Sequence, residues 1–382
     1  MSEAAGPLRG VKVVEIASLA PGPFAGFMLA DMGADVVRVD RREAVGVDMG
    51  TLLLGRGRRS IGVDLKHPDG ADVVRRLVDG ADVLIEGFRP GVMERLGLGP
   101  ADLMARNPSL VYGRMTGFGQ DGPLAHAAGH DINYIALAGV LGMIGRHGQP
   151  PTPPLNLIGD FGGGGMLLAF GIACALLEAR STGRGQVVDA AMIDGSSLLM
   201  LAFFGGRSRG EGGWGERGTN LLDSGAPFYD VYETADGGWV SVGAIEPQFY
   251  ATLVRGLGLD PAELPDQMDR GSWPDMKARL AAVFATRTRA EWCEVFEGTD
   301  ACFAPVLGLE EVEGHAHASA RGAYVGVANV VQPAPAPRLS VTPGSVRRPP
   351  PAAGAHTDEV LAEWLSLPPG QIEQLRAAGA VG

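Results

Sequence analysis

The chain has 382 residues, a formal net charge of −12 at pH 7 and a hydrophobic content of 46%. This composition supplies enough apolar material for a large core, so it excludes intrinsic disorder, and the length predicts two to three domains. An acidic chain is not expected to bind nucleic acid or an anionic membrane through its overall charge. A local basic pocket for an anionic ligand remains compatible with it.

Three cysteines, Cys174, Cys293 and Cys302, lie far apart and form no CxxC motif. We therefore expect neither a disulfide framework nor a zinc site. The first residues, MSEAAGPLRG, lack a basic segment followed by an apolar one, so no signal peptide is expected. The longest apolar run, Met166–Leu177, is shorter than the roughly 18–20 residues that span a bilayer. These features predict a cytoplasmic protein without a membrane partner.

Short apolar runs alternate with helix-compatible segments in the first third of the chain. Pro23–Met32 and Pro68–Val78 are such helical segments. Alternation of this kind predicts an α/β domain, Rossmann-like, with a parallel sheet covered by helices, and ligands beyond the carboxyl ends of its strands. The predicted strands are Val11–Ile16, Asp35–Val39, Ile61–Leu65, Asp82–Ile85 and Leu110–Met115, followed later by Gln186–Met192.

A glycine-rich break at Gly162–Gly165 is expected before a long apolar helix that runs through Ala179. Beyond residue 225 the pattern changes. Phe228–Thr234 and Trp239–Val242 flank an Asp-Gly turn and predict a β-hairpin, and helical segments follow it. This part predicts a smaller α+β domain.

The predicted domain boundaries follow from these changes in pattern. A proline-rich, extended connector covers residues 332–351, and the last helices are expected to begin with Thr357 as an N-cap. The large domain is assigned to residues 1–200, a linker to 201–225, the small domain to 226–320, and the return linker with the rest of the large domain to 321–382.

Known nucleotide-binding motifs are missing. The turn after the first predicted strand, PGPFAG at residues 21–26, does not match GxGxxG, and no Walker lysine motif occurs. NAD-dependent chemistry is therefore disfavoured. Arg38, Arg41 and Arg42 instead gather at the end of the second predicted strand, and Arg89 follows another. Guanidinium groups at these positions can bind phosphates bidentately, although a solvated basic surface is an equally good interpretation.

His130 and Asp160 each lie beside glycine, in AGHDINY and in NLIGDFGGGG. An imidazole and a carboxylate could act on a small substrate from opposite sides, and the glycines allow a close approach of the backbone. On residue types alone, a structural histidine and a helix-capping aspartate are the simpler interpretation. His315 and His317 are spaced like a metal-binding pair but have no cysteine partner, so we expect a surface loop and no metal site.

Five motifs together change this interpretation. They resemble the α-methylacyl-CoA racemases, a branch of the class III CoA-transferase family, and the resemblance runs from Leu8 to about Thr357. AGHDINY and GAIEPQFY are specific to that branch, whereas GFRPGV and TGFGQDGP are typical of the broader family. The motifs are GFRPGVMERLGLGP (87–100), MTGFGQDGP (115–123), AGHDINY (128–134), PPLNLIGDFGGGG (153–165) and GAIEPQFY (243–250).

The resemblance implies an interlocked homodimer in which the large domain contains both chain ends. It also implies an isomerase that interconverts (2R)- and (2S)-2-methylacyl-CoA thioesters by a two-base 1,1-proton transfer through an enolate. Coenzyme A would be part of the substrate, and no metal, flavin or nicotinamide cofactor is expected.

By the same resemblance, His130 and Asp160 are the catalytic acid/bases, and Glu246 is the glutamate that pairs with the histidine. We expect burial to raise the pKa of Asp160, and backbone N–H groups near Asp160 and its glycine run to stabilise the enolate. The residues expected to bind the substrate or CoA are Arg38, Arg41, Val63, Asp64, Leu65, Lys66, Arg89, Gly129, Asp131, Tyr134, Asn156 and Tyr229.

Two other functions remain open. In a CoA-transferase, Asp160 would attack the thioester and carry the acyl group, and relatives of that type lack the histidine of AGHDINY. A non-catalytic acyl-CoA-binding protein would keep the arginines without a usable base. The presence of His130, Asp160 and Glu246 favours the racemase over both.

Overall fold

The computed structural model describes residues 6–47, 53–208 and 214–382. The chain divides into two compact units, each described by itself below. The first unit comprises residues 1–138, 155–199 and 322–382, and the second comprises residues 139–154 and 200–321.

The sequence pattern assigns residues 139–154 to the large domain, but in the structure they belong to the second unit. Polar contacts within that unit account for the difference. Arg146 forms an ion pair with Asp230 at 2.8 Å. Arg217 donates a hydrogen bond to the carbonyl oxygen of Gly142 at 2.8 Å.

Six parallel strands form the sheet of the first unit, as the alternating sequence pattern predicts. Their order is β3-β2-β1-β4-β5-β6, so the sheet reverses direction of winding between β1 and β4. The strands are β1 (Lys12–Ile16), β2 (Asp35–Arg41), β3 (Arg59–Val63), β4 (Val83–Glu86), β5 (Val111–Thr116) and β6 (Val187–Ala191).

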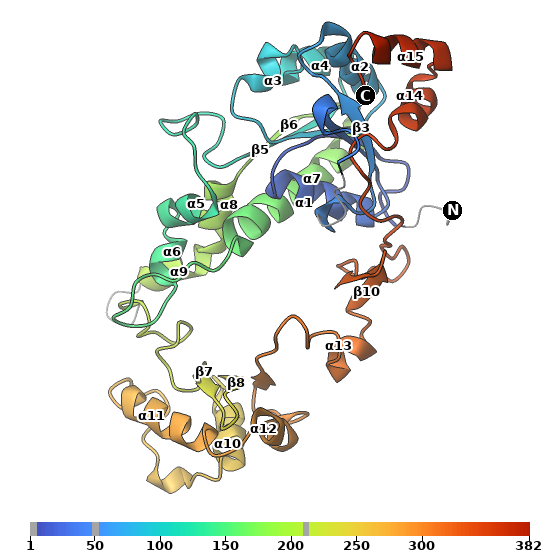
Figure 1. Cartoon of the computed structure of the whole chain (residues 1–382). Coiled ribbons are helices and arrows are strands. Elements are labelled where there is room, and N and C mark those ends of the chain that lie inside the picture. Colours follow the sequence, from blue (N-terminus) through green and yellow to red (C-terminus); the bar gives the residue numbers. More distant parts are fainter. Residues whose placement is uncertain (1–5, 48–52, 209–213) are drawn as a thin grey trace. The chain divides into compact units, whose positions relative to one another are not determined.

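Helices cover both faces of this sheet, above and below it in Figure 1. Successive residues of a strand point to opposite faces, so Val13 packs in one core and Val14 in the other. The face of Val13 is covered by α1 (Pro21–Asp31) and α7 (Leu167–Thr182). The face of Val14 is covered by α2 (Pro68–Asp79), α3 (Val92–Arg95), α4 (Pro100–Arg106), α14 (Thr357–Leu365) and α15 (Pro369–Ala377).

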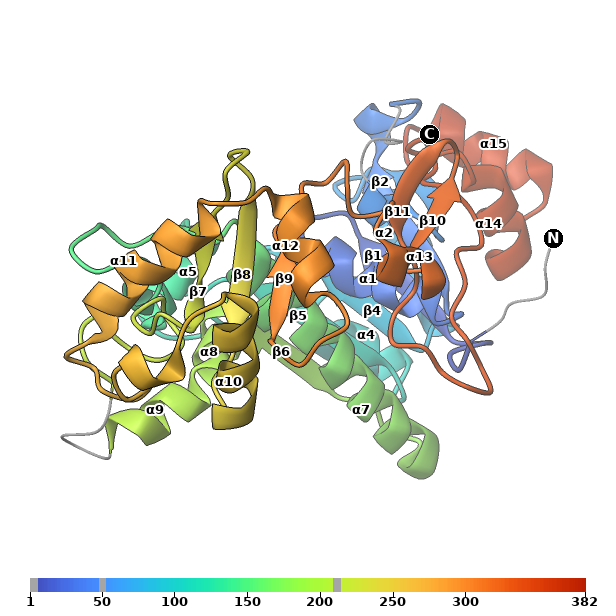
Figure 2. The same ribbon diagram turned by 90° about the horizontal axis from the view of Figure 1, so that it is seen from below.

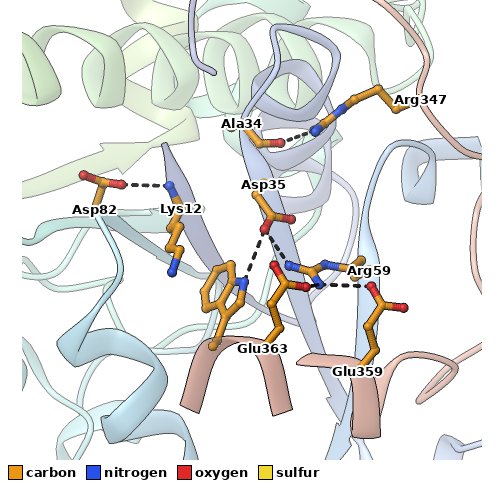
Figure 3. A network of polar contacts seen from close by, with 9 residues as sticks. Lys12, Ala34, Asp35, Arg59, Asp82, Arg347, Glu359 and Glu363 are labelled. Atoms are coloured by element: carbon orange, nitrogen blue, oxygen red, sulfur yellow. Dashed lines mark hydrogen bonds and ion pairs between the residues drawn. The ribbon is translucent and has the colours of Figure 1, made fainter. Parts of the chain in front are cut away.

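Strand β3 begins at Arg59, two residues before the apolar run that predicts it. The buried Arg59 guanidinium lies 2.5 Å from Asp35 and also pairs with Glu359 and Glu363 of α14 (Figure 3). Because β3 starts with a charged residue, its first positions do not follow the apolar pattern, and the predicted strand begins too late. These ion pairs attach the carboxyl-terminal helices to β2 and β3.

Helix α14 begins at Thr357, and its N-cap is His356 rather than the expected Thr357. The Thr357 hydroxyl instead accepts a hydrogen bond from the backbone N–H of Gly62 in β3 at 3.1 Å. The threonine therefore joins the helix to the sheet and does not cap the helix.

The expected break at Gly162–Gly165 is wrong. Leu157–Met166 forms a π-helical turn, η3, that continues into α7. The glycines serve close packing against helix α8 (Met192–Leu199), because a Cβ on Gly163 would lie 2.6 Å from the backbone nitrogen of Ser196.

Together η3 and α7 make one 26-residue helix, Leu157–Thr182, that is long and apolar enough to cross a membrane by length and composition alone. The expectation that no segment reaches this length is therefore incorrect. Core helices pass the same test, and Leu168, Ile172 and Leu176 of this helix pack in the core beside the sheet.

The second unit contains a three-stranded antiparallel sheet in the order β7-β8-β9, which includes the predicted hairpin. Its core is aromatic: Tyr232 stacks on Phe284, and Trp292 stacks on Phe296. The elements are β7 (Tyr229–Glu233), β8 (Trp239–Gly243), β9 (Phe303–Pro305), α10 (Pro247–Gly256), α11 (Trp273–Phe284) and α12 (Arg289–Phe296), which are visible in Figure 2.

Short elements complete the described chain. Leu201–Arg207 is helical (α9), although the sequence pattern predicts a linker there. The others are α5 (Asp131–Leu137), α6 (Val140–Met143), α13 (Ala316–Ala320), the strand pair β10 (Tyr324–Val327) and β11 (Val330–Pro333), and single turns at Arg42–Ala44, Leu53–Gly55 and Pro261–Glu263.

Candidate active site

A cavity of about 910 Å³ opens in the first unit at the carboxyl ends of β1, β2, β4 and β5. The turns after β1 and β4, residues 17–21 and 87–90, both contribute to its lining. These two strands are neighbours in the sheet but lead into different halves of it. The cavity therefore lies at the topological switch point, where open α/β sheets bind their ligands.

Three of the predicted arginines line this cavity: Arg38, Arg41 and Arg89. Arg38 is largely buried and lies 2.9 Å from Asp40, which partly satisfies its charge. Arg41 and Arg89 are exposed to solvent. Two exposed guanidinium groups at strand ends can hold the phosphates of an anionic ligand.

His130 lines the cavity and is the N-cap residue of α5. Its backbone N–H donates a hydrogen bond to the Asn133 side chain at 3.1 Å, so its position is set by the start of the helix. Two further predicted residues, Gly129 and Tyr134, line the cavity beside it. The Tyr134 hydroxyl donates to the Gly129 carbonyl oxygen and holds this loop closed on itself.

Asp160 also lines the cavity, from the π-helical turn η3. Burial raises the pKa of its carboxyl group, and the charge of Asp131 raises it further. A hydrogen bond from Asn156 Nδ2 to Asp160 Oδ2 at 3.0 Å and the nearby His130 act in the opposite direction. The net effect is a raised pKa, as expected from the sequence.

Asp131 does not line the cavity, although the sequence predicts it to contact the ligand. Its side chain is buried, and its Oδ1 accepts the backbone N–H of Asp160 at 2.7 Å. The N–H of Asp160 is therefore already hydrogen-bonded to Asp131. It is not the backbone donor that we expected to stabilise an enolate. Asn156 is likewise outside the lining, and its side chain donates a hydrogen bond to Asp160, which lines the cavity.

The segment Val63–Lys66 lies outside the lining of this cavity. Val63 is buried and pairs with Val381 near the end of the chain. The Asp64 side chain accepts the backbone N–H of Lys66 at 2.9 Å, and Leu65 packs against the core. Lys66 is exposed.

Tyr229 and Glu246 belong to the second unit. Tyr229 begins β7, and Glu246 is the N-cap residue of α10. Both are exposed, and the Glu246 side chain makes no capping hydrogen bond with its helix. Capping of α10 therefore does not account for a glutamate at this position.

Some lining residues carry no motif that a sequence search would select. They include residues 18–20 after β1 and Met192 at the start of α8. Their shared signal is their place at the end of a predicted parallel strand or just beyond it, which is where such a sheet binds ligands. Among the described residues, no group of three or more His, Cys, Asp or Glu side chains is arranged to hold a metal ion.

Comparisons with known proteins agree with this architecture. The sequence profile of CoA-transferase family III matches residues 8–357. The chain is 52% identical over 361 residues to the alpha-methylacyl-CoA racemases of Mus musculus and Homo sapiens, which covers 94% of this chain and 93% of each relative. The crystal structure of a CAIB/BAIF family protein from Brucella suis superposes with a TM-score of 0.80 at 26% identity, over 94% of this chain and all of the other.

Proposed function

The chain belongs to CoA-transferase family III, and from that premise we propose that it is an isomerase that interconverts (2R)- and (2S)-2-methylacyl-CoA thioesters. The 52% identity to two racemases over nearly the whole chain supports this activity. The observation that carries the proposal is that His130 and Asp160 line one cavity together with exposed arginines.

The proposed reaction is a 1,1-proton transfer at C2. The thioester carbonyl acidifies the C2–H bond, one residue removes the proton from one face, and an enolate forms. The other residue then delivers a proton to the opposite face, which inverts the configuration. In one direction neutral His130 takes the proton and protonated Asp160 supplies one. In the reverse direction ionised Asp160 takes it and charged His130 supplies one.

The environment of Asp160 supports this cycle, because its raised pKa lets the carboxyl group hold a proton at a higher pH than an ordinary aspartate does. A 1,1-proton transfer changes no oxidation state. We therefore propose that the reaction needs neither flavin nor nicotinamide, and that coenzyme A enters as part of the substrate, held by Arg41 and Arg89.

We further propose that the protein works as a homodimer, for which the exposed face of α7 supplies support. Met166, Phe170 and Leu177 are 52%, 67% and 73% exposed and lie on one face of the continuous helix at intervals of four and seven residues. The opposite face is already buried against the sheet. A helix that is apolar on both sides is typical of one that packs against a second chain.

Glu246 would complete the site by orienting His130 and favouring its charged form. In the interlocked arrangement that the family resemblance implies, the glutamate would come from the partner chain. Its exposed side chain, without a helix cap to make, is free to take this role in an assembly.

The rival function is CoA transfer, in which the Asp160 carboxylate attacks the thioester carbon and coenzyme A leaves as the thiol. The family name covers that chemistry. Attack by the Asp160 carboxylate needs no second base on the opposite side of the substrate. The presence of His130 in the same cavity favours the racemase.

Deuterium exchange separates the two functions. The protein is incubated with a (2R)-2-methylacyl-CoA in deuterated water, and C2 is followed by NMR. We expect deuterium at C2 together with inversion. Movement of coenzyme A to an added free acid without exchange at C2 would replace the racemase with a transferase.

A further inference from the structure

We propose that Asp131 is a positioning residue for Asp160: one of its carboxylate oxygens accepts the backbone N–H of Asp160 and fixes the turn that carries the Asp160 carboxyl group. The inference deepens the proposed racemase activity, on which it rests, by assigning a role to a buried acid that does not line the cavity.

The geometry gives Asp131 a defined contact. The N–H of Asp160 donates to Asp131 Oδ1 over 2.7 Å, and the Asp131 residue is only 6% exposed. Gly159 allows this approach, because a Cβ at that position would lie 2.4 Å from Asp131 Oδ1. Asp131 also follows His130 directly at the start of α5. One side chain therefore links the helix that begins at His130 to the turn that carries Asp160.

Electrostatics give the same residue a second effect. The charge of Asp131 raises the pKa of Asp160, in the same direction as burial, whereas Asn156 and His130 lower it. Burial raises the pKa of the neighbouring Tyr134, and the charges of Asp160 and Asp131 raise it further.

Other charged groups do not replace this effect. The other elements that pack against the η3 turn carry the charged residues Asp31 (α1), Arg114 (β5), Glu178 and Arg180 (α7), Asp189 (β6) and Asp194 (α8). Asp31 is held by Arg56 at 2.5 Å, and Asp194 acts on Asp189. Asp131 is thus the acidic neighbour that bears on Asp160.

A simpler explanation is that Asp131 only stabilises the start of α5, as acidic residues in the first turn of a helix do. That role would affect the free energy of unfolding but would not change the ionisation of Asp160. The two explanations therefore differ in what a neutral side chain of the same shape should do.

Asp131→Asn provides this side chain. Its amide oxygen can keep the hydrogen bond from Asp160, and its amide nitrogen takes the position of Oδ2, which has no hydrogen-bond partner among the described residues. We expect the backbone to stay in place while the pKa of Asp160 falls. Selective ¹³C labelling of aspartate carboxyl groups measures that pKa directly, with the Asp160 signal identified by its loss in Asp160→Asn.

The activity of the full-length protein should change accordingly. In the direction in which Asp160 takes the proton, the acidic limb of kcat/KM should move to lower pH in Asp131→Asn. Asp131→Ala loses the hydrogen bond as well, so its kcat should fall by about tenfold or more while KM changes little. Asp131→Asn should regain most of that kcat.

Asn156→Leu should raise the pKa of Asp160, because the variant loses the Asn156 amide, which lowers that pKa in the wild type. Asp82→Asn is the matched control: Asp82 accepts the backbone N–H of Lys12 at the same 2.7 Å (Figure 3) but does not line the cavity. It should leave both the ¹³C titration of Asp160 and the pH profile unchanged.

An unchanged Asp160 titration in Asp131→Asn would overturn the proposal, as would a raised KM at constant kcat in Asp131→Ala, which would make Asp131 a substrate contact. The carboxyl titration does not depend on which reaction is catalysed. A wild-type protein without C2 exchange would therefore refute the racemase function while leaving the effect of Asp131 on Asp160 measurable.

Discussion

The backbone N–H of Phe88 donates a hydrogen bond to Glu86 Oε2 at 2.7 Å, within the turn that follows β4. Phe88 and Arg89 line the cavity, whereas Glu86 is fully buried. Its other oxygen, Oε1, accepts from Arg114 of β5 at 3.0 Å. Glu86 therefore connects the sheet to the turn that carries Arg89.

This buried acid should make stability depend on pH. Burial raises the pKa of Glu86 to about 7, although Phe88 and Arg114 act against the shift. Between pH 4.5 and 7 the folded protein keeps a proton that the unfolded chain releases, so the free energy of unfolding should fall as pH rises through this window. For this group alone the fall is on the order of 3 kcal/mol. Urea unfolding at pH 5 to 8 measures it.

Glu86→Gln should remove this contribution, so that the variant gains stability relative to the wild type as pH rises from 5 to 7. Glu94→Gln is the control, because Glu94 shares Arg114 but is half exposed. Partial burial raises the pKa of Glu94, but hydrogen bonds from the backbone and from Arg114 outweigh it and lower the pKa overall. The contribution of Glu94 is lost only at more acidic pH. A flat difference for Glu86→Gln across pH 5 to 8 would contradict the assignment.

His130→Ala and Asp160→Ala should each abolish racemisation, because each residue serves one face of the substrate. Binding of acyl-CoA, measured by calorimetry, should remain largely intact. One variant is expected to exchange the C2 proton of one enantiomer without inversion, which would assign each base to its face. Racemisation near the wild-type rate in both variants would refute the two-base mechanism.

Arg41→Ala and Arg89→Ala should raise KM by about tenfold or more with little change in kcat. A charge-assisted hydrogen bond to a phosphate contributes about 1.5–3 kcal/mol to binding, and it is made equally in ground and transition states. Steady-state kinetics measure the changes in KM and in kcat separately. Arg184→Ala, an exposed arginine outside the cavity, serves as control. A large loss of kcat at constant KM would instead locate these arginines near the reacting carbon.

Phe170→Glu should weaken the proposed homodimer by about tenfold or more, because an apolar side chain of this size contributes about 1.5–3 kcal/mol when it is buried. Sedimentation equilibrium measures the dissociation constant. Val341→Glu, at a position that is 88% exposed and outside α7, should leave it unchanged. Equal self-association of Phe170→Glu and the wild type would exclude the apolar face of α7 as the interface.

A mixed dimer tests whether Glu246 acts across chains. One chain carries His130→Ala and the other Glu246→Ala, after each homodimer has been found strongly impaired. If the glutamate acts on the partner, one site collects both changes and the other is fully wild type, so about half of the activity returns. If it acts within its own chain, every site keeps one change. A purified heterodimer that stays inactive would refute the cross-chain role.

Local patterns in the sequence predicted the parallel sheet well, because each strand is a short run of apolar residues between helical segments. Val83–Glu86 and Val111–Thr116 lie almost where those runs predict them. The strand at Arg59 began earlier than its apolar run, since the buried arginine is held by acids from β2 and α14. Its partners lie far away in the sequence.

Sequence patterns and motifs were enough to predict a parallel sheet, the edge at which the cavity opens, and His130 and Asp160 as candidate bases. The folded structure shows, in addition, that Asp131 lies outside the lining of the cavity and accepts the backbone N–H of Asp160, and that Val63 pairs with Val381 outside the same lining. Strand and helix patterns arise from interactions between near neighbours, so they can be read along the chain. The direction of a buried side chain depends instead on which distant segment packs against it, and folding alone brings those segments together.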